Sequence, residues 1–350
     1  GVDYIHPDLG GSGSQEEYNK NNPTIIEEEV NYPNAKIIGG YDFVGEDYNP
    51  DIPDKRVPNP DPDPFDQLGH GTHVAGIIGG YGVLNDGSRY NGSYDSSTLN
   101  NSFSVPPGVA PEIQIYALKI FSTSPKSEIL IPAIEWAIDP NQDGDFEDRV
   151  DIINLSLGED FGFSDTPECI ACENAFELGT LVIASAGNRG DSFYAIAMPA
   201  SASSVIGVGA YEDPDPNIPS NTPYRMAYFS SRGPSISSSN NLILKPDISA
   251  PGIWILSANL GASPLEKISS GTSMSAPHIS GIVGLMKEVS PELSPSELKA
   301  ILINNAIYHT VLIKGDVTYS AGPTISGGGR LDLANNINLG IIAFNADKPE

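Results

Sequence analysis

The chain has 350 residues and a formal net charge of −27, from 18 lysines and arginines against 45 aspartates and glutamates. Such a charge repels the phosphate backbone, so we expect no nucleic acid partner, and it also disfavours an anionic membrane. No run of residues reaches the roughly 18 consecutive apolar positions of a membrane helix. Two cysteines cannot build a disulfide scaffold, whereas 39% hydrophobic residues can build a core.

The first part of the chain is acidic and irregular. Residues 36–44 are apolar enough for one strand, but the proline-rich run at 58–64 can continue neither a helix nor a central strand, since proline lacks the N–H group. We predict that the rest of residues 10–66 is an acidic insertion of surface loops. A second, polar insertion is predicted at residues 81–107, which are rich in Ser, Asn and Gly.

From residue 70 onward, helical and apolar strand patterns alternate. Helices are predicted at residues 70–80, 128–138, 169–178, 273–289 and 294–306, and strands at 113–121, 150–157, 180–185 and 205–210. This alternation predicts an α/β fold with a central, mostly parallel sheet and helices on both faces. Ligands of such sheets bind beyond the carboxyl ends of the strands.

Residues 70–76, His-Gly-Thr-His-Val-Ala-Gly, lead from a polar loop into a helix of small residues. The positive end of the helix dipole disfavours imidazolium, so His70 would stay neutral near pH 7 and could act as a base. The alternative is an ordinary glycine-rich turn.

Residues 271–278, Gly-Thr-Ser-Met-Ser-Ala-Pro-His, start a long helix. The hydroxyl of Ser273 would lie in the field of free backbone N–H groups, which stabilise negative charge that develops nearby. The alternative is a set of N-capping hydroxyl residues, which begin many helices.

Two further motifs follow predicted strands. Asn188 comes after residues 184–187, where its amide could donate to an oxyanion, although an asparagine after glycine is also common in turns. Residues 156–158, Ser-Leu-Gly, end another strand, whose edge could pair with an extended peptide or could simply stop there.

The order and spacing of these four motifs resemble those of the subtilisin-like serine peptidases, the subtilases. Further matching stretches lie at residues 229–234, 245–252 and 328–332, and the pattern is most similar to secreted multi-domain bacterial and fungal-type members. The resemblance implies a subtilisin-like three-layer sandwich. It also implies one peptidase domain over residues 1–340, followed by a C-terminal tail or linker at 341–350.

The same resemblance implies the roles of individual residues in a serine endopeptidase that is extracellular or at the cell surface. His70 is then the general base, Ser273 the nucleophile and Asn188 an oxyanion donor. The implied substrate-binding residues are Ser156, Leu157, Gly158, Ala186, Gly187 and Ala197. Ala197 would lie near the floor of the first specificity pocket, where a small residue favours large apolar side chains. The implied partners are protein or peptide substrates and the protein's own propeptide or N-terminal fragment.

The third member of the triad is missing from this sequence. In the family, the catalytic aspartate lies on a central strand, two residues before the position of Gly1, and Asp3 matches a different family aspartate. We expect that the strand and its aspartate precede Gly1 in a longer chain. One alternative is a degenerate, inactive subtilase that acts as a binding or structural module. Another is a different serine hydrolase, such as an esterase, but Ser273 lacks the Gly-x-Ser-x-Gly elbow.

Structural Ca²⁺ is the expected cofactor. Asp139, Asn141, Asp143 and Asp145 place oxygen ligands at alternate positions of a calcium-type loop, with glycine at the sixth. The twelfth position is Val150 where a glutamate would be expected, so an acidic turn is an equal alternative. Asp8 matches a calcium ligand of the family.

The two cysteines, Cys169 and Cys172, are expected to form a local disulfide or to be two buried thiols. A redox role is less favoured, because no thioredoxin-like context accompanies them.

Overall fold

The computed structural model describes residues 1–331 apart from 28, 29, 123, 125, 214–223, 262, 309, 315 and 316. The chain divides into two compact units. The first unit consists of Gly1–Ala133 with Leu256–Ile268, and the second of Ile134–Ile255 with Ser269–Glu350. The single peptidase domain over residues 1–340 stays a prediction, and the tail at 341–350 lies outside the described residues.

The first unit contains short elements joined by long connections. Its helices are η1 (Pro7–Leu9), α1 (Gln15–Lys20), η2 (Pro53–Lys55), α2 (His70–Gly79), η3 (Thr98–Asn100) and the start of α3 (Leu130–Ile138). Its strands are β1 (Ile37–Asp42), β2 (Val83–Leu84), β3 (Phe103–Val105), β4 (Ile115–Lys119) and most of β12 (Ile255–Ala258) and β13 (Glu266–Ser269).

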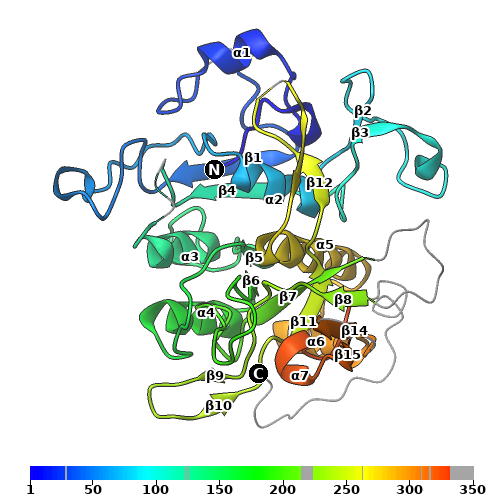
Figure 1. The fold of residues 1–350 in the computed structure, drawn as a ribbon. Helices are drawn as coiled ribbons and strands as arrows, with labels where there is room; N and C mark the ends of the chain where they lie inside the picture. Colours follow the sequence, from blue (N-terminus) through cyan, green and yellow to red (C-terminus); the bar gives the residue numbers. More distant parts are fainter. Residues whose placement is uncertain are drawn as a thin grey trace. The chain divides into compact units, whose positions relative to one another are not determined.

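Strands β1 and β4 pair in parallel and lie side by side (Figure 1). Among the described residues, these two strands form a sheet of their own. At its end, Lys119 is buried and its Nζ lies 2.8 Å from Oδ2 of Asp42 and 2.7 Å from Oε1 of Glu46. This ion network satisfies charges that would otherwise be costly to bury.

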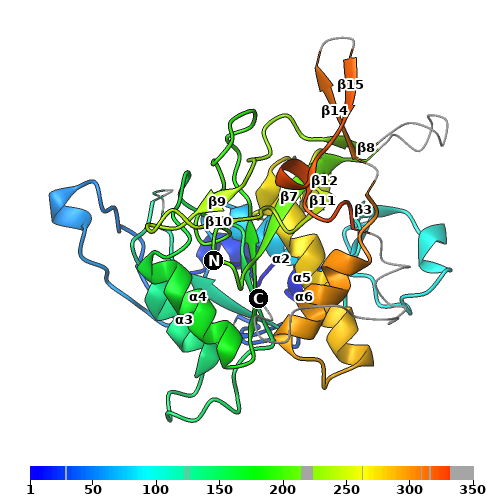
Figure 2. The same ribbon diagram turned by 90° about the horizontal axis from the view of Figure 1, so that it is seen from below.

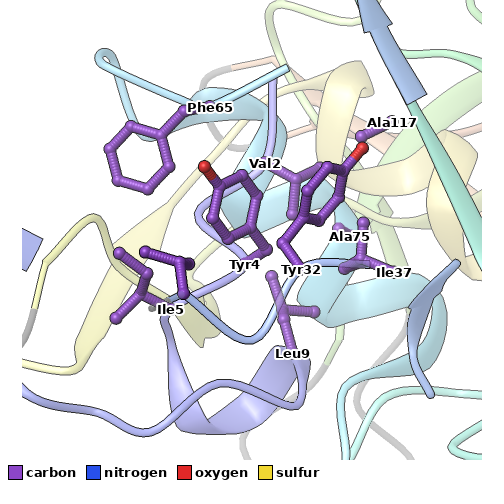
Figure 3. Close-up of a cluster of buried hydrophobic side chains, with 10 residues drawn as sticks. Val2, Tyr4, Ile5, Leu9, Tyr32, Ile37, Phe65, Ala75 and Ala117 are labelled. Carbon is purple, nitrogen blue, oxygen red and sulfur yellow. The ribbon is translucent and has the colours of Figure 1, made fainter. Parts of the chain in front are cut away.

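The core of the first unit corrects the prediction for residues 10–66. Tyr32 and Phe65 come from this segment, yet both are buried, and Tyr32 stacks on Tyr4 with ring centroids 4.2 Å apart (Figure 3). The segment also forms α1, whose N-cap Ser14 accepts a hydrogen bond from the N–H of Glu17. The prediction that the segment is only surface loop is therefore wrong, because its scattered aromatic residues pack against a core supplied by distant residues.

The polar insertion at residues 81–107 contains the antiparallel pair β2–β3. Val83 and Val105 are fully buried and pack with Ala258. The two valines are too few to give a periodic apolar pattern in the sequence.

The second unit holds the elements that the alternating pattern predicts from residue 150 onward, with smaller strands added. Its helices are α4 (Pro167–Glu177), α5 (Thr272–Val289), α6 (Pro295–Asn304) and α7 (Pro323–Ser326). Its strands are β5 (Ile152–Leu155), β6 (Leu181–Ser185), β7 (Ile206–Glu212), β8 (Tyr224–Met226), β9 (Ser235–Ile236), β10 (Leu242–Ile243), β11 (Ile248–Pro251), β14 (Thr310–Lys314) and β15 (Val317–Ser320).

Within the described residues, the main sheet has seven strands and is mixed. The strand order is β15-β14-β8-β7-β6-β5, and β11 also pairs with β7. Strands β5, β6, β7 and β11 are mutually parallel, so their carboxyl ends share one edge of the sheet. Helix α5 packs on these four strands, and α4 covers the opposite face from α5 and α6 (Figure 2). The second unit confirms the prediction of a mostly parallel sheet with helices on both faces.

The ends of the predicted helices follow their capping signals. Ser294 makes a capping box with Glu297 at the start of α6, and Thr166 caps α4 by accepting from the N–H of Cys169. Cys169 and Cys172 are both buried and both free thiols, so the disulfide alternative is wrong. Burial raises the pKa of Cys172, which disfavours a redox role.

None of the helices in the described part of the chain is both long and apolar enough to cross a membrane.

Candidate active site

Ser273 lies in the first turn of α5, where backbone N–H groups have no partner within the helix. Its carbonyl oxygen accepts a hydrogen bond of 2.7 Å from the hydroxyl of Ser156, just beyond the end of β5. A second link joins the same strand and helix, because Ser280 donates to Oδ1 of Asn154 at 2.8 Å. The start of α5 is therefore held against the carboxyl end of β5, and Ser273 is half-buried there.

Asn188, which follows β6, is held by the residue before the serine. Its Oδ1 accepts hydrogen bonds from the N–H and the Oγ1–H of Thr272, at 3.0 and 3.1 Å. The hydroxyl of Thr272 in turn accepts from the N–H of Gly187 at 3.1 Å. Because these bonds occupy the oxygen end of the amide, the Nδ2 end is left to donate elsewhere. Sequence reasoning did not assign a role to Thr272, whose only signal is its place between Gly271 and Ser273.

Gly271 lies close to both possible donors. A Cβ atom at this glycine would lie 3.7 Å from the backbone N of Ser273 and 3.8 Å from both Nδ2 and Oδ1 of Asn188. The side-chain amide and the backbone N–H group thus lie near one point beside Gly271. Two such donors can together stabilise an oxyanion.

The predicted substrate-binding residues meet beside Asn188. A Cβ atom on Gly158 would lie 2.9 Å from Cβ of Ala197, and one on Gly187 would lie 3.1 Å from the same atom. The N–H of Ala197 donates to the carbonyl of Ala186 at 2.9 Å, and Ser185 donates to the carbonyl of Leu157. Backbones approach this closely only because the residues are glycine or alanine. The segment after β5 remains accessible, since Gly158 is exposed and Leu157 half-buried.

His70 is the first residue of α2 in the first unit, directly after Gly69, whose φ of 81° favours glycine. Desolvation lowers the pKa of His70, the ammonium of Lys267 lowers it further, and Asp66 acts in the opposite direction. The imidazole is therefore neutral near pH 7 because of its burial, whereas the sequence predicted a neutral imidazole from the helix dipole.

Asp66 organises the loop that delivers His70. Its carboxylate accepts hydrogen bonds from the N–H groups of Leu68 and Gly69 and from both the N–H and the hydroxyl of Thr72. Burial raises the pKa of Asp66, whereas the hydrogen bonds from Thr72 and from the N–H of Leu68 lower it. The sequence analysis did not single out this residue, although an aspartate shortly before a helix is a common turn and capping signal.

Asp8 is a fully buried carboxyl group with one oxygen unpartnered. Oδ1 accepts from the N–H of Gly82 at 2.6 Å, whereas Oδ2 has no hydrogen-bond partner. Burial raises the pKa of Asp8 to about 7, and the Gly82 N–H and the ammonium of Lys36 partly oppose this shift. A buried oxygen of this kind fits a hard cation. The described residues contain no group of three or more His, Cys, Asp or Glu arranged to hold a metal.

The acidic turn after α3 uses its side chains on its own backbone. Asp139 accepts from the N–H groups of Asp143 and Gly144, Asn141 from that of Asp143, and Asp143 from that of Asp145. These oxygen atoms lie on one exposed turn at the spacing of a calcium loop. The same bonds also suit a turn without metal.

The structure thus brings Ser273, Asn188 and the substrate-binding residues together within the second unit, while His70 lies in the first. The juxtaposition of His70 with Ser273 stays a prediction. The calcium roles of Asp8 and of the acidic turn also remain untested.

Comparison with known proteins gives a consistent family. Residues 1–334 match the model of the subtilase family of peptidases. The chain is 31% identical to serine protease AprX of Bacillus subtilis over 79% of its length, and 31% identical to subtilisin DY of Bacillus licheniformis over 79% of its length. It spans 59% of AprX and 79% of subtilisin DY.

Among solved structures, the chain is similar to sphericase, with a TM-score of 0.62 and 26% identity, covering 95% of this chain and 88% of that one. The fold is therefore α/β and subtilisin-like.

Proposed function

Because this chain belongs to the subtilase family of serine peptidases, we propose that it is a secreted endopeptidase with Ser273 as nucleophile, His70 as general base and Asn188 as oxyanion donor. The observation that carries the proposal is the pair of donors around Gly271. The Nδ2 of Asn188 and the backbone N of Ser273 both lie within 4 Å of a Cβ position at Gly271, and two oxyanion donors have to lie close together in this way.

The reaction follows from these groups. Ser273 Oγ attacks the peptide carbonyl while His70 takes its proton, and the oxyanion is held by Asn188 Nδ2 and the Ser273 N–H. His70 then returns the proton to the leaving amine, and the C–N bond breaks to leave an acyl-enzyme. Water, deprotonated by His70, hydrolyses the ester and restores Ser273.

The substrate binds along the segment that follows β5. Residues Ser156, Leu157 and Gly158 pair with the acyl side of an extended peptide, next to Ala186 and Gly187. Ala197 lies against Gly158 and Gly187. Its small side chain leaves room for a large apolar or aromatic residue before the scissile bond.

The carboxylate of the triad is contributed by the residue two positions before Gly1. Two facts about the first unit support this. The carboxylate of Asp66 accepts hydrogen bonds from the N–H and the hydroxyl of Thr72. The carboxylate of Asp3 accepts hydrogen bonds from the N–H groups of Ile5 and Gly261, so both carboxylates already have partners. A Cβ atom on Gly71 would collide with the carbonyl oxygen of Gly1, so Gly1 lies beside the start of α2, next to His70.

Calcium, if bound, supplies structural cross-links rather than chemistry. We propose Oδ2 of Asp8 as one ligand and the acidic turn with Asp139, Asn141, Asp143 and Asp145 as a second, weaker site. Extracellular or cell-surface location and interaction with a propeptide or N-terminal fragment belong to the same proposal.

Labelling with a fluorophosphonate tests the proposal. The complete protein should be modified once, at Ser273, as located by peptide mass spectrometry, and Ser273→Ala should abolish the label. His70→Ala should slow labelling strongly, because a serine without its base is a weak nucleophile. A folded, complete chain that takes no label would instead support the inactive binding module.

A further inference from the structure

The main sheet of the second unit ends, among the residues that the structure describes, in the hairpin β14–β15. Strand β15 is the first in the strand order and pairs with β14 in an antiparallel register that runs from Val311–Ser320 to Lys314–Val317. On its other edge, no strand of the described chain pairs with it. The free N–H and C=O groups of such an edge are a template for a further strand.

The base of the hairpin is anchored to the second unit. Leu312 and Ala321 pack in a cluster around Tyr211, and the N–H of Ala321 donates to the carbonyl of Thr310 at 2.9 Å. On its other side, β14 pairs with β8 through Thr310 and Val311. The direction of the hairpin is therefore fixed at its base.

Beyond Leu312 the hairpin is a ribbon of two strands. Figure 2 shows it extending away from the helices of the second unit. All four residues of β15 are exposed, with Val317 at 49% and Tyr319 at 51%, and Ile313 on β14 is exposed as well. A two-stranded ribbon is only marginally stable in water, and a third strand stabilises it.

The free edge lacks the features that usually prevent strands from pairing. The sequence of β15, Val-Thr-Tyr-Ser, contains no proline and no charged residue, and its register with β14 shows no bulge. Its β-branched and aromatic residues favour strand pairing. An edge with this composition is expected to bind another strand.

The distribution of charge favours a second copy of this chain as the partner. Residues 300–329 contain Lys314 and Asp316 and no other Asp, Glu, Lys or Arg, although the whole chain has a net charge of −27. A cationic partner, which the rest of the chain would attract, finds no complementary charge along this segment. Two copies of the acidic chain repel each other least where both are formally neutral.

Symmetry favours the same partner. Two identical edge strands can pair antiparallel about a two-fold axis, so that each supplies the same hydrogen bonds to the other. With the axis between Thr318 and Tyr319, Thr318 of one copy lies opposite Tyr319 of the other, and an aromatic ring beside a β-branched side chain is a favourable cross-strand pair. The two Lys314 side chains then lie at opposite ends of a four-stranded ribbon.

We propose that β15 is the interface of a homodimer, in which the edges of two copies pair antiparallel and join their main sheets into one continuous sheet. Because a pair of short strands is a small interface, we expect a dissociation constant in the micromolar range, roughly 1–100 µM. The proposal does not depend on the peptidase function.

Sedimentation velocity of the complete protein tests the dimer. Ser273→Ala would serve as the parent protein, so that self-digestion cannot affect the result. The measurements would be made in about 0.15 M salt, which screens the net charge. They would cover about 1–300 µM protein, on both sides of the expected dissociation constant.

Two charge variants of the edge would be compared with the parent. Thr318→Glu/Tyr319→Glu places like charges opposite each other in the dimer, and Thr318→Lys/Tyr319→Lys does the same with the other sign. Both positions are exposed, so neither variant disturbs packing within one copy. The control is Leu242→Glu/Leu244→Glu, which adds the same negative charge at exposed positions in and beside β10.

We expect the parent protein and the control to form dimers as the concentration rises. Each edge variant should have a dissociation constant at least about tenfold higher, because like charges directly opposite each other are destabilising. An equimolar mixture of the Glu and Lys variants should form a heterodimer, since each lysine then faces a glutamate. Amide hydrogen exchange at residues 317–320 should slow in the dimer of the parent protein.

A parent protein that stays monomeric over the whole concentration range would overturn the proposal. A dimer that both edge variants retain would also overturn it, because its interface would lie elsewhere, and so would an assembly larger than two copies, because a two-fold interface is closed. Loss of the dimer in both variants without recovery on mixing would show a disturbed fold rather than paired edges, and would count against the proposal as well.

Discussion

The surroundings of His70 and of Ser273 hold polar groups in place by different means. The first unit, which carries His70, buries many charged and titratable side chains, namely Asp3, His6, Asp8, Lys36, Asp42, Asp63, Asp66 and Lys119. Around Ser273, the second unit uses neutral groups: the hydroxyls of Thr272 and Ser156 and the amide of Asn188.

This difference predicts which part of the molecule responds to a change of pH. Buried carboxyl groups and lysines have shifted pKa values, so the first unit changes its charge balance near neutrality. Hydroxyl and amide contacts do not titrate there. We therefore expect pH to act on activity mainly through the first unit, which carries His70.

The largest effect should come from removing either catalytic residue. Ser273→Ala and His70→Ala should each lower kcat about 10⁶-fold, as for the corresponding residues of subtilisin, and the double variant should lose no more than either single one. If the double variant loses no more kcat than a single variant, the two residues act in the same step. If the two losses of kcat multiply in the double variant, the two residues act independently and the proposal is wrong. Ser239→Ala, an exposed serine of the second unit, should keep full activity.

The neutral network around the oxyanion donor should matter next. Asn188→Ala should lower kcat about 10²- to 10³-fold with little change in KM, because it removes one donor to the oxyanion. Steady-state kinetics at several pH values would measure this, and the shape of the pH profile should not change. A profile displaced along the pH axis would contradict the contrast between the two units.

Thr272 positions that donor, so its hydroxyl should carry a smaller effect. Thr272→Val keeps the backbone N–H bond to Asn188 but loses both 3.1 Å bonds of the hydroxyl, the one donated to Asn188 and the one accepted from Gly187. We expect a loss of kcat of about 10- to 100-fold, in line with two hydrogen bonds. Thr272→Ser should restore most of it. A Thr272→Ser variant as slow as Thr272→Val would argue for packing by the methyl group instead.

Asp8 offers the matching test in the first unit. Its pKa rises from 3.8 to about 7 on folding, so stability from the protonated carboxyl is present at pH 4 and lost as the pH rises through about 7. In the presence of a chelator, Asp8→Asn should therefore raise the free energy of unfolding at pH 8, by about 4 kcal/mol at most, and change little at pH 4. Urea denaturation at both pH values would measure this.

Calcium should reverse the sign of that effect. If Oδ2 of Asp8 binds Ca²⁺, adding the ion at pH 8 should raise the Tm of the wild type and not that of Asp8→Asn. Asp54→Asn, at an exposed position of the same unit, is the control. A variant that is less stable than wild type at pH 8 in chelator would contradict the assignment of Asp8 as a costly buried charge.

The smallest effect concerns packing in the second unit. A Cβ atom on Gly158 would lie 2.7 Å from the carbonyl oxygen of Met198, whereas one on Gly322 would meet nothing within 4 Å. Gly158→Ala should lower the free energy of unfolding by roughly 1–3 kcal/mol, and Gly322→Ala should be neutral or slightly stabilising. Thermal unfolding of both variants would compare them, and equal Tm values would remove the evidence for close packing beside Ala197.

Much of the second unit could be predicted from its pattern. An apolar strand was predicted at residues 180–185 and a long helix at 273–289. The structure has β6 at Leu181–Ser185 and α5 at Thr272–Val289. Short strands such as β9 and β10 were missed, because two residues carry no periodicity. In the first unit, Tyr32 and Phe65 are buried by partners far away in the sequence, which no local window contains.

The candidate site divides in the same way. The residue types in three motifs predict the chemical roles of Ser273, Asn188 and His70. Thr272 and Asp66 were not assigned, because their importance lies in what they hold: the amide of Asn188 and the loop before His70.

The order of the motifs and the alternation of helices and strands were determined by the amino-acid sequence alone, since both depend on neighbouring residues. Only the tertiary structure decided which polar groups are buried and which face each other. Asp8 is shielded from solvent by residues around position 80, and Asn188 is hydrogen-bonded to Thr272, which is 84 residues away in the sequence. Desolvation and hydrogen bonding depend on distance in space, and distance along the chain does not predict it.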